Sequence, residues 1–398
     1  MKKNIIKLAV AGAVLAAASA AQAGIVIPAG EWTLDVNGNV NAFAIMSRAK
    51  DSNSITGGLA STKDSAGEKN GYGINTGLLP SWLGFTGTTR QNDVDVSFTI
   101  SMQPNVSDNG TAGDGNTPLN RQAFLTFGDK SWGSFKLGKD IGIFASDAIL
   151  NDMTLLGVGA GGQQSGGATT LGGIGTGYIY AAWKGQVAYT TPNMNGFQAT
   201  VGITNPNQGI IGSGHASAVS NLNQDRFGLE GKASYSFSAN DLTGKIWVSG
   251  ASYKVKATTA AEYTAYAGDI GVNANAGNFG ATAYIYAGEG YGSYMPLQNG
   301  VSATGIKRDS DGGYVQLTYA LPTKTKLGVA YGISSLDLAS GESSSALFKD
   351  NERVTVGAYH PLTKHLNLVA EYNNIESKSH NGLKNESSSL SLGAILFF

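Results

Sequence analysis

The sequence contains no cysteine, and it has only 9 prolines in 398 residues. The absence of cysteine excludes disulfide scaffolds, thiolate metal sites and cysteine nucleophiles together. Basic and acidic residues balance at 27 and 28, so nothing in the composition suggests a nucleic-acid partner, which would require a basic face. Glycine, by contrast, reaches 56 residues, roughly double the usual share of about 7%. With so little proline, the chain does not have the composition of a disordered low-complexity protein.

The first 23 residues have the pattern of a secretory signal peptide. A positively charged start and a short run of small apolar residues at 8–20 lead to an A-x-A cleavage site at 21–23. A membrane anchor is the weaker interpretation, because a spanning helix needs about 20 apolar residues. No later stretch could form a transmembrane helix. We therefore expect cleavage after Ala23 and a mature chain of residues 24–398.

Apolar and polar residues alternate strictly along much of the mature chain. In 94–102, for example, valine, phenylalanine, isoleucine and methionine alternate with aspartate, serine and threonine, and 197–203 and 327–333 repeat the pattern. This period of two predicts β-strands with one apolar and one polar face. A soluble sandwich would turn the apolar face inward, whereas a transmembrane barrel would turn it outward, towards lipid.

The connections between these strands favour the barrel. Short turns, such as 90–93 and 238–241, alternate along the chain with long polar stretches. Outer-membrane barrels have this asymmetry, with short periplasmic turns and long external loops. The long stretches include 47–72, 104–119, 205–225 and 291–311.

Counting hairpins predicts an all-β fold, a transmembrane antiparallel barrel of about 16 strands that occupies 24–398 as one domain. The last strand places four aliphatic residues and Phe398 on one face, and a closing aromatic of this kind is what the outer-membrane insertion machinery recognises. The predicted strands are 32–46, 78–90, 94–103, 121–128, 133–140, 184–192, 196–204, 226–237, 243–256, 263–276, 279–289, 312–321, 326–336, 352–361, 366–376 and 387–398.

Several short segments carry a resemblance to a known family. In chain order they are SWLGF (81–85), RQAFLTFG (121–128), GSFKLGK (133–139), VAYTTP (187–192), NGF (195–197) and the closing segment 392–398. In this order and spacing, the chain resembles the general porin family of Gram-negative bacteria, particularly its betaproteobacterial branch. The resemblance implies a sixteen-stranded homotrimer in outer-membrane lipid, with no cofactor and no catalysis. It also implies passive diffusion of small hydrophilic solutes and ions, and a third external loop folded into the lumen.

The chain departs from the family pattern in the pore. Trp82 stands where such porins usually carry arginine in the second strand, and Lys139 stands in place of an arginine in the fifth. Gly185 and Ala188 replace charged or amide residues of the sixth strand. An arginine-rich constriction is therefore thinned, and the sequence leaves the choice between anions and cations open.

The segment 141–183 is the expected constriction loop, because it is long and apolar for a surface loop. We predict a short helix within 145–156, with Ser146 or Asp147 as its N-cap and Gly157 as its end. An apolar face of this helix suits packing against the barrel wall.

Acidic residues of the loop and cations of the wall are expected to form the constriction. Alternation places Lys136, Lys232 and Trp82 on the inward face, whereas Lys139 has the opposite parity at the end of its strand. Opposite charges across a pore would orient dipolar solutes and filter ions. The alternative for each residue is an ordinary cap or a lumen charge too far from the solute path. The predicted constriction residues are Asp147, Asp152, Trp82, Lys136, Lys139 and Lys232.

Two other functions are open at this stage. An inward Trp82 could stack on a sugar ring or an aromatic acid, which would make a substrate-selective channel for a small carbohydrate or organic acid. An outer-membrane hydrolase would need a histidine with a serine or aspartate at the rim, and the four scattered histidines offer no such group. The G-x-G-x-x-G match at 157–162 lacks a surrounding strand–helix unit, so we expect no dinucleotide site.

Overall fold

The computed structural model describes residues 24–104, 106, 118–161, 169–205, 222–223, 226–257, 262–343 and 345–398. The predicted signal at 1–23, and most of the predicted loops 104–119 and 205–225, lie outside these residues. Within the described ranges, none of the helices reaches the length and apolar character that a membrane span requires.

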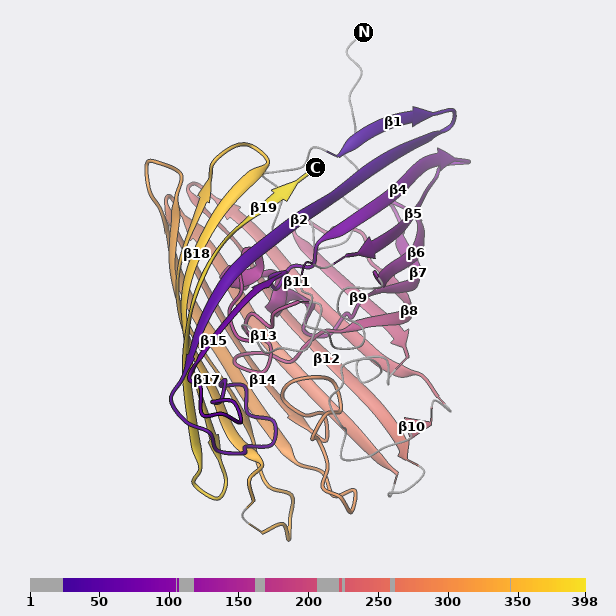
Figure 1. Cartoon of the computed structure of the whole chain (residues 1–398). Helices are drawn as coiled ribbons and strands as arrows, with labels where there is room; N and C mark the ends of the chain where they lie inside the picture. Colours follow the sequence, from indigo (N-terminus) through magenta and orange to yellow (C-terminus); the bar gives the residue numbers. More distant parts are fainter. Residues whose placement is uncertain are drawn as a thin grey trace.

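The described strands join edge to edge into one antiparallel sheet that closes on itself (Figure 1). Closure occurs where the last strand pairs with β2, from Ser387 with Ala49 to Phe397 with Asn39. The first strands are β1 (Ile25–Ala29), β2 (Trp32–Ala49), β3 (Asn70–Asn75), β4 (Trp82–Gln91), β5 (Val94–Gln103), β6 (Leu119–Asp129), β7 (Gly133–Ile141), β8 (Trp183–Thr190), β9 (Phe197–Thr204) and β10 (Leu222–Asn223). The others are β11 (Gly228–Ala239), β12 (Leu242–Ala257), β13 (Tyr263–Ala276), β14 (Phe279–Glu289), β15 (Asp309–Ala320), β16 (Lys326–Leu336), β17 (Phe348–Pro361), β18 (Leu366–Ser379) and β19 (Lys384–Phe397).

Sixteen of these described strands form the ring, because three short ones are additions to it. The strand β1 pairs with the start of β2, and β19 pairs with the rest of the same edge of β2, so β1 and β19 share one position in the ring. Strands β3 and β4 pair with successive parts of β2, so they share one position in the ring. The two residues of β10 pair with the end of β12. The predicted sixteen-strand barrel is therefore confirmed.

The two faces of the sheet have opposite characters. In β19, Leu390, Leu392 and Leu396 are exposed on the outside, whereas Ser389 and Ser391, which alternate with the first two, are buried inside. The other strands show the same alternation, so the outer surface is a band of aliphatic and aromatic side chains. An apolar exterior around a polar interior is the arrangement of a barrel in lipid.

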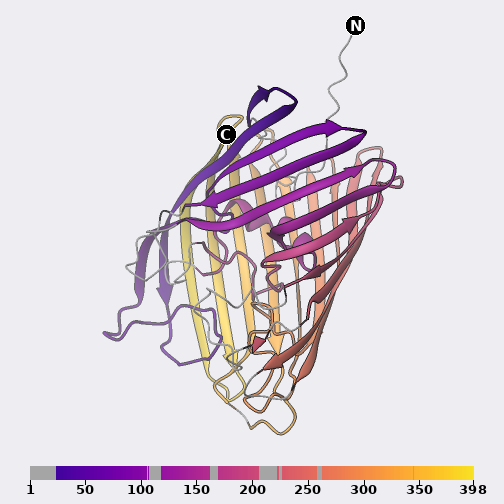
Figure 2. The same ribbon diagram turned by 90° about the vertical axis from the view of Figure 1, so that its right-hand side faces the viewer.

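The barrel has a low and a tall side (Figures 1 and 2). The strands β4 to β9, which we call the low wall, contain 8 to 11 residues each. The strands β11 to β19, the tall wall, contain 11 to 16. Tight turns join the strands at the end that holds both termini, and Asn92 and Asp93 adopt positive φ angles of 48° and 61° in one of them. Asparagine and aspartate tolerate this conformation, which two-residue hairpins require.

The second strand position differs from the prediction of one strand at 78–90. It begins at Asn70, within the predicted loop 47–72, and it is interrupted at residues 76–81. There the chain leaves the wall for the interior, and the side chain of Asn41 replaces the missing ladder bonds. Its Oδ1 accepts from the N–H of Gly77 at 2.9 Å, and its Nδ2 donates to the carbonyl of Leu79 at 3.0 Å. Satisfied in this way, buried backbone groups can leave a sheet without a large penalty.

Candidate pore constriction

The segment between β7 and β8 runs from residue 142 to residue 182, and its described residues lie inside the barrel (Figure 2). Its described part, 142–161 and 169–182, contains the helix α1 (Ser146–Leu150) and the 3₁₀ helix η2 (Met153–Leu156). We call it the inner loop. The prediction of a constriction loop at 141–183 coincides with this segment, and residues 162–168 are outside the described part.

The predicted helix at 145–156 is two short helices, and its predicted N-caps, Ser146 and Asp147, are wrong. Ala145, with a φ of 61°, precedes α1 and makes no side-chain cap. The hydroxyl of Ser146 donates to the carbonyl of Ile143 instead, at 2.9 Å. Asp152 caps the second helix, because its Oδ1 accepts from the N–H of Thr154 at 2.9 Å. The predicted end at Gly157 is confirmed, since this glycine is the C-cap of η2.

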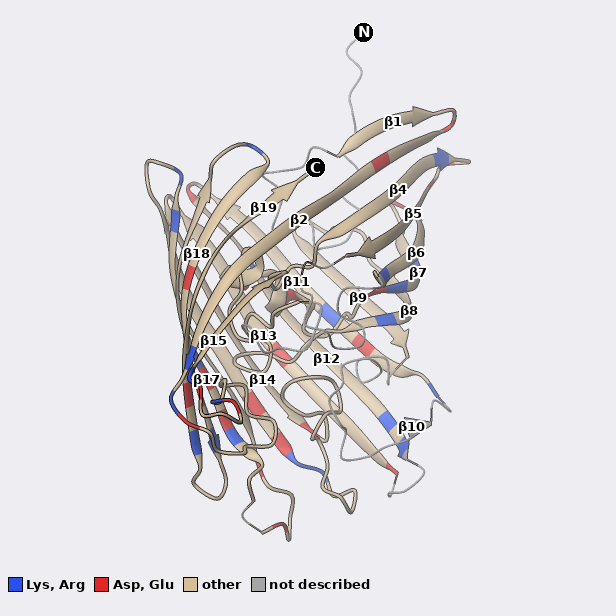
Figure 3. Cartoon of the chain, viewed as in Figure 1, with Lys and Arg blue, Asp and Glu red and all other residues tan. Residues whose placement is uncertain are grey.

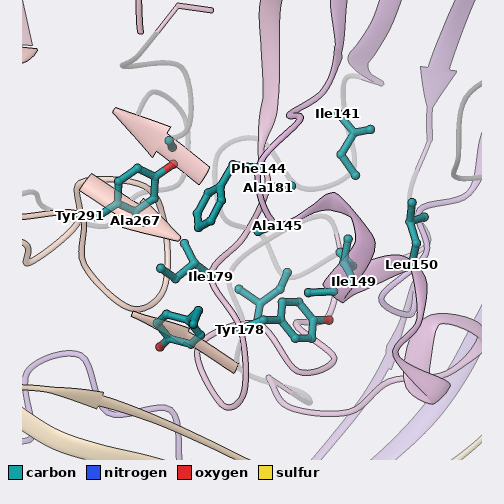
Figure 4. Close-up of a cluster of buried hydrophobic side chains, with 14 of the residues drawn as sticks. Ile141, Phe144, Ala145, Ile149, Leu150, Tyr178, Ile179, Ala181, Ala267 and Tyr291 are labelled. Carbon is teal, nitrogen blue, oxygen red and sulfur yellow. The ribbon is translucent and has the colours of Figure 1, made fainter. Parts of the chain in front are cut away.

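Apolar side chains pack the inner loop against the tall wall and an external loop (Figure 4). Phe144 meets the ring of Tyr291 edge-on, with centroids 5.3 Å apart, and Tyr178 meets Tyr314 of β15 at 5.7 Å. Ile149 and Leu150 of α1 are buried in the same cluster. Burial of each large side chain contributes roughly 2 kcal/mol, so this packing alone favours an ordered loop.

Glu230 of β11 fixes the start of the inner loop. Its Oε2 accepts from the backbone N–H groups of Ile143 and Phe144, at 2.7 and 3.0 Å. Its Oε1 pairs with the ammonium of Lys184 and with the hydroxyl of Tyr253. All of these side chains are fully buried, so the carboxylate has exchanged water for a complete set of protein donors. Such a set is what a buried charge requires.

Glu371 of β18 holds the middle of the loop in the same manner. Its Oε2 accepts from the N–H groups of Val158 and Gly159, at 2.9 and 2.8 Å. The hydroxyl of Tyr359 donates to its Oε1 at 2.7 Å. Glu230 and Glu371, two buried residues on distant strands, therefore both accept hydrogen bonds from the backbone of the inner loop.

Asp147 of α1 meets two cations of the wall. Lys232 of β11 donates to its Oδ2 at 3.0 Å, and Lys245 of β12 pairs with its Oδ1. Burial alone would raise the pKa of Asp147, but the two ammonium groups outweigh burial and lower it. The carboxylate is therefore ionised at neutral pH, and the group of three carries one net positive charge. Charged residues are sparse along the strands, where they form isolated bands (Figure 3).

Asp152 lies deeper inside the barrel than the prediction implied. The hydroxyl of Tyr178 donates to its Oδ2 at 2.9 Å, and the guanidinium of Arg353 is 3.7 Å from the same oxygen. All three side chains are buried. Asp152 thus ties the loop to β17 and does not face an open path.

The remaining predicted residues are dispersed. Lys136 faces inward and forms an ion pair with buried Asp140 on its own strand. Lys139 donates to the carbonyl of Asn120 at 2.8 Å, away from this group. Trp82 points inward as predicted but is only 7% exposed, because its ring packs edge-on against Phe397 of the closing strand at 6.2 Å. So little of the Trp82 ring is accessible that the structure offers no surface for stacking a sugar.

Several charged residues of the site were missing from the predicted set. They include Lys184, Glu230, Lys245, Arg353 and Glu371, and each of these lies at an inward position of its strand. The same alternation that placed Lys232 could have found them. Among the described residues, no group of histidine, aspartate and glutamate has the arrangement of a metal site.

A closed sixteen-strand barrel with an apolar exterior and a loop folded into its lumen is the architecture of an outer-membrane channel. The family model described as Gram-negative porin matches residues 8–380. The chain belongs to the Gram-negative porin family, and it is accordingly a channel of the outer membrane and not an enzyme.

Solved structures support the same fold. The chain is similar to the outer-membrane channel DcaP of Acinetobacter baumannii, with a TM-score of 0.68, 18% identity and coverage of 95% of this chain and 100% of that one. It is also similar to the anion-selective porin of Comamonas acidovorans, with a TM-score of 0.62, 14% identity and coverage of 92% and 100%. For OmpF of Salmonella typhi the values are 0.59, 14%, 94% and 100%. No curated protein matches the chain.

Proposed function

We propose that this porin allows passive diffusion of small hydrophilic solutes and ions, and that the inner loop sets the constriction. The observation that carries the proposal is the double attachment of the loop backbone to Glu230 and Glu371. A loop held from two distant strands narrows the lumen permanently, whereas a loosely attached loop would leave a wider pore. Lys136, Lys232 and Asp147 are the predicted constriction residues that we expect to act on passing ions.

We further expect this channel to prefer anions, because its lysines remain accessible while their carboxylate partners are buried. The side chains of Lys136, Lys232 and Lys245 are 28%, 19% and 31% exposed. Those of Asp140 and Asp147 are only 0% and 4% exposed. A permeating ion would therefore meet ammonium groups first, and rings of lysine or arginine favour anions in pores.

We make two further proposals, one on the export of the chain and one on the assembly of its subunits. We infer that a signal peptide is removed after Ala23, which N-terminal sequencing of the mature protein would test by finding Gly24 first. We also propose a homotrimer in outer-membrane lipid, with the low wall as the contact between subunits. Two strands of the low wall, β8 and β9, contain 8 residues each, fewer than the about 9–11 residues that a spanning strand needs.

The test is the conductance and reversal potential of the purified protein in a planar bilayer under a gradient of potassium chloride. We expect stable channels that close in three steps, with a reversal potential of the sign that chloride permeation gives. In the double variant Lys232→Gln/Lys245→Gln, Asp147 loses both partners, so the permeability ratio of chloride to potassium should fall by about tenfold. Asp147→Asn should raise that ratio.

Lys364→Gln is the matched control, because Lys364 is exposed in a turn between β17 and β18 and should leave the ratio unchanged. Channels with cation preference, or a ratio that the lysine variants do not alter, would contradict the assignment of the lysines and leave diffusion intact. Correctly folded protein that forms no channels would contradict the diffusion function itself.

A further inference from the structure

We propose that the outer face of the tall wall holds one acyl chain of a phospholipid from the periplasmic leaflet. A groove with a volume of about 510 Å³ crosses this face from β12 to β16. Every residue that lines it is uncharged. This site lies outside the lumen and is independent of the diffusion function.

The shape of the groove follows from a patch of small residues among large ones. Ala274 of β13 pairs directly with Ala281 of β14, and Ala276 lies one outward position nearer the turn. Leu317 of β15 stands beside Ala281 on the far side. Because the alanines project so little, the larger neighbours form the sides of a channel about as wide as one strand spacing, which suits a single hydrocarbon chain.

The groove faces lipid rather than the lumen. Phe279 and Leu317, which line it, are among the most exposed apolar residues of the outer surface, at 66% and 62%. In the strand order of the ring, β14 and β15 lie opposite β5 and β6 of the low wall. A subunit that docks on the low wall would therefore leave this groove open to the bilayer.

The periplasmic end of the groove suits a phosphate headgroup. Phe279 and Tyr319 stack there with ring centroids 4.7 Å apart, and aromatic residues of barrels gather at the membrane interface. Lys324, in the turn between β15 and β16, is exposed three residues before the lining residue Leu327. No acidic residue lies in that turn, 321–325. An anionic phosphate at this level would complement Lys324, while its acyl chain runs along the alanines.

The experiment is native mass spectrometry of the full-length mature protein, extracted from outer membranes in a mild detergent and then titrated with phosphatidylglycerol. We expect one phospholipid to remain bound to the wild-type barrel. The variant Ala274→Leu/Ala281→Leu fills the groove and should lower retention by about tenfold, which corresponds to roughly two methylene groups that are no longer buried. Lys324→Gln should weaken retention by loss of the phosphate contact.

Ala287→Leu is the matched control, because Ala287 lies on the same strand and the same outer face but does not line the groove. It should retain lipid as the wild type does. Equal retention by the filled variant and the wild type would overturn the proposal and show ordinary annular lipid only. A wild-type barrel that carries no lipid above the level of the Ala274→Leu/Ala281→Leu variant would overturn it as well. Heat-modifiable migration of each variant checks that the barrel has folded.

Discussion

At the scale of single residues, buried charged side chains hold the inner loop in place. Lys184 and Glu230 are both fully buried, and their pairing is completed by Tyr253 and by two backbone N–H groups of the inner loop. A buried pair of this kind adds little net stability compared with an apolar pair, yet removal of one partner is costly. Removal of one partner should therefore lower the stability of the barrel by a measurable amount.

Glu230→Gln should lower the temperature at which the barrel unfolds in detergent, because it leaves the ammonium of Lys184 buried without a counter-charge. The expected cost is roughly 3–5 kcal/mol. The double variant Lys184→Met/Glu230→Gln should recover most of this loss. Unfolding is followed by the change in electrophoretic migration on heating.

A control for this prediction is Glu289→Gln, which breaks the exposed pair with Lys307 and should change stability by less than about 1 kcal/mol. If Glu230→Gln were as stable as this control, the buried pair would not be needed to hold the loop.

The sequence predicted the direction of inward residues better than their surroundings. Alternation alone placed Lys136, Lys232 and Trp82 inside the barrel, because side chains of a strand alternate between its two faces. It could not show that Trp82 is covered by Phe397, since these residues are more than 300 positions apart in the chain. Exposure inside a barrel depends on how loops fill the lumen, which local patterns do not encode.

At the scale of elements, strands were predicted closely and interruptions were not. The predicted strand 279–289 is β14 itself, and the predicted closing strand 387–398 lies within three residues of β19 at its start. The break at 76–81 escaped prediction because its leucines look like strand residues in the sequence. Its cause is remote, namely the amides of Asn39 and Asn41 on β2, which bind the carbonyls of Pro80 and Leu79.

The contact between Arg308 and Glu342, in the external loops, should depend on pH. Arg308, just before β15, binds Glu342 with two parallel hydrogen bonds, from Nε at 2.8 Å and from Nη2 at 2.6 Å. The bond from Arg308 is the main reason that the pKa of Glu342 is lowered, and the N–H of Ala339 and the charge of His380 act in the same direction. Because the folded pKa is lowered, the stabilising contact is fully present above the ordinary carboxylate pKa. It is lost as the pH falls through the lowered value.

Amide exchange of residues 337–343, corrected for its intrinsic pH dependence, should therefore speed up only when the pH falls below the usual carboxylate range. In Glu342→Gln the faster exchange should appear already at neutral pH, and further acid should change it little. Exchange that already rose near pH 6–7 in the wild type, well above the carboxylate range, would contradict the assignment to Glu342.

At the scale of the whole molecule, the difference between the low and tall walls bears on assembly. Val201 of β9 and Val356 of β17 are both valines on the outer face, with exposures of 52% and 53%. They differ in the wall to which they belong, which makes them a matched pair. Neither position faces the lumen.

If subunits meet at the low wall, Val201→Trp should reduce the trimer fraction, because a packed interface cannot accept the larger ring without strain. Val356→Trp should leave the trimer fraction unchanged, since fluid lipid adapts to it. The fractions are measured by chemical cross-linking in outer membranes. Equal effects of both changes, or none from either, would place the contact elsewhere or argue against a trimer.

The attachment of the inner loop by its backbone has a consequence for protein engineering. Glu230 and Glu371 bind peptide N–H groups, which any residue except proline supplies, and not particular side chains. The placement of the loop is therefore largely decoupled from the identity of the side chains it carries towards the solute. Libraries that vary those side chains while keeping both glutamates should produce barrels that share one frame and differ in permeability.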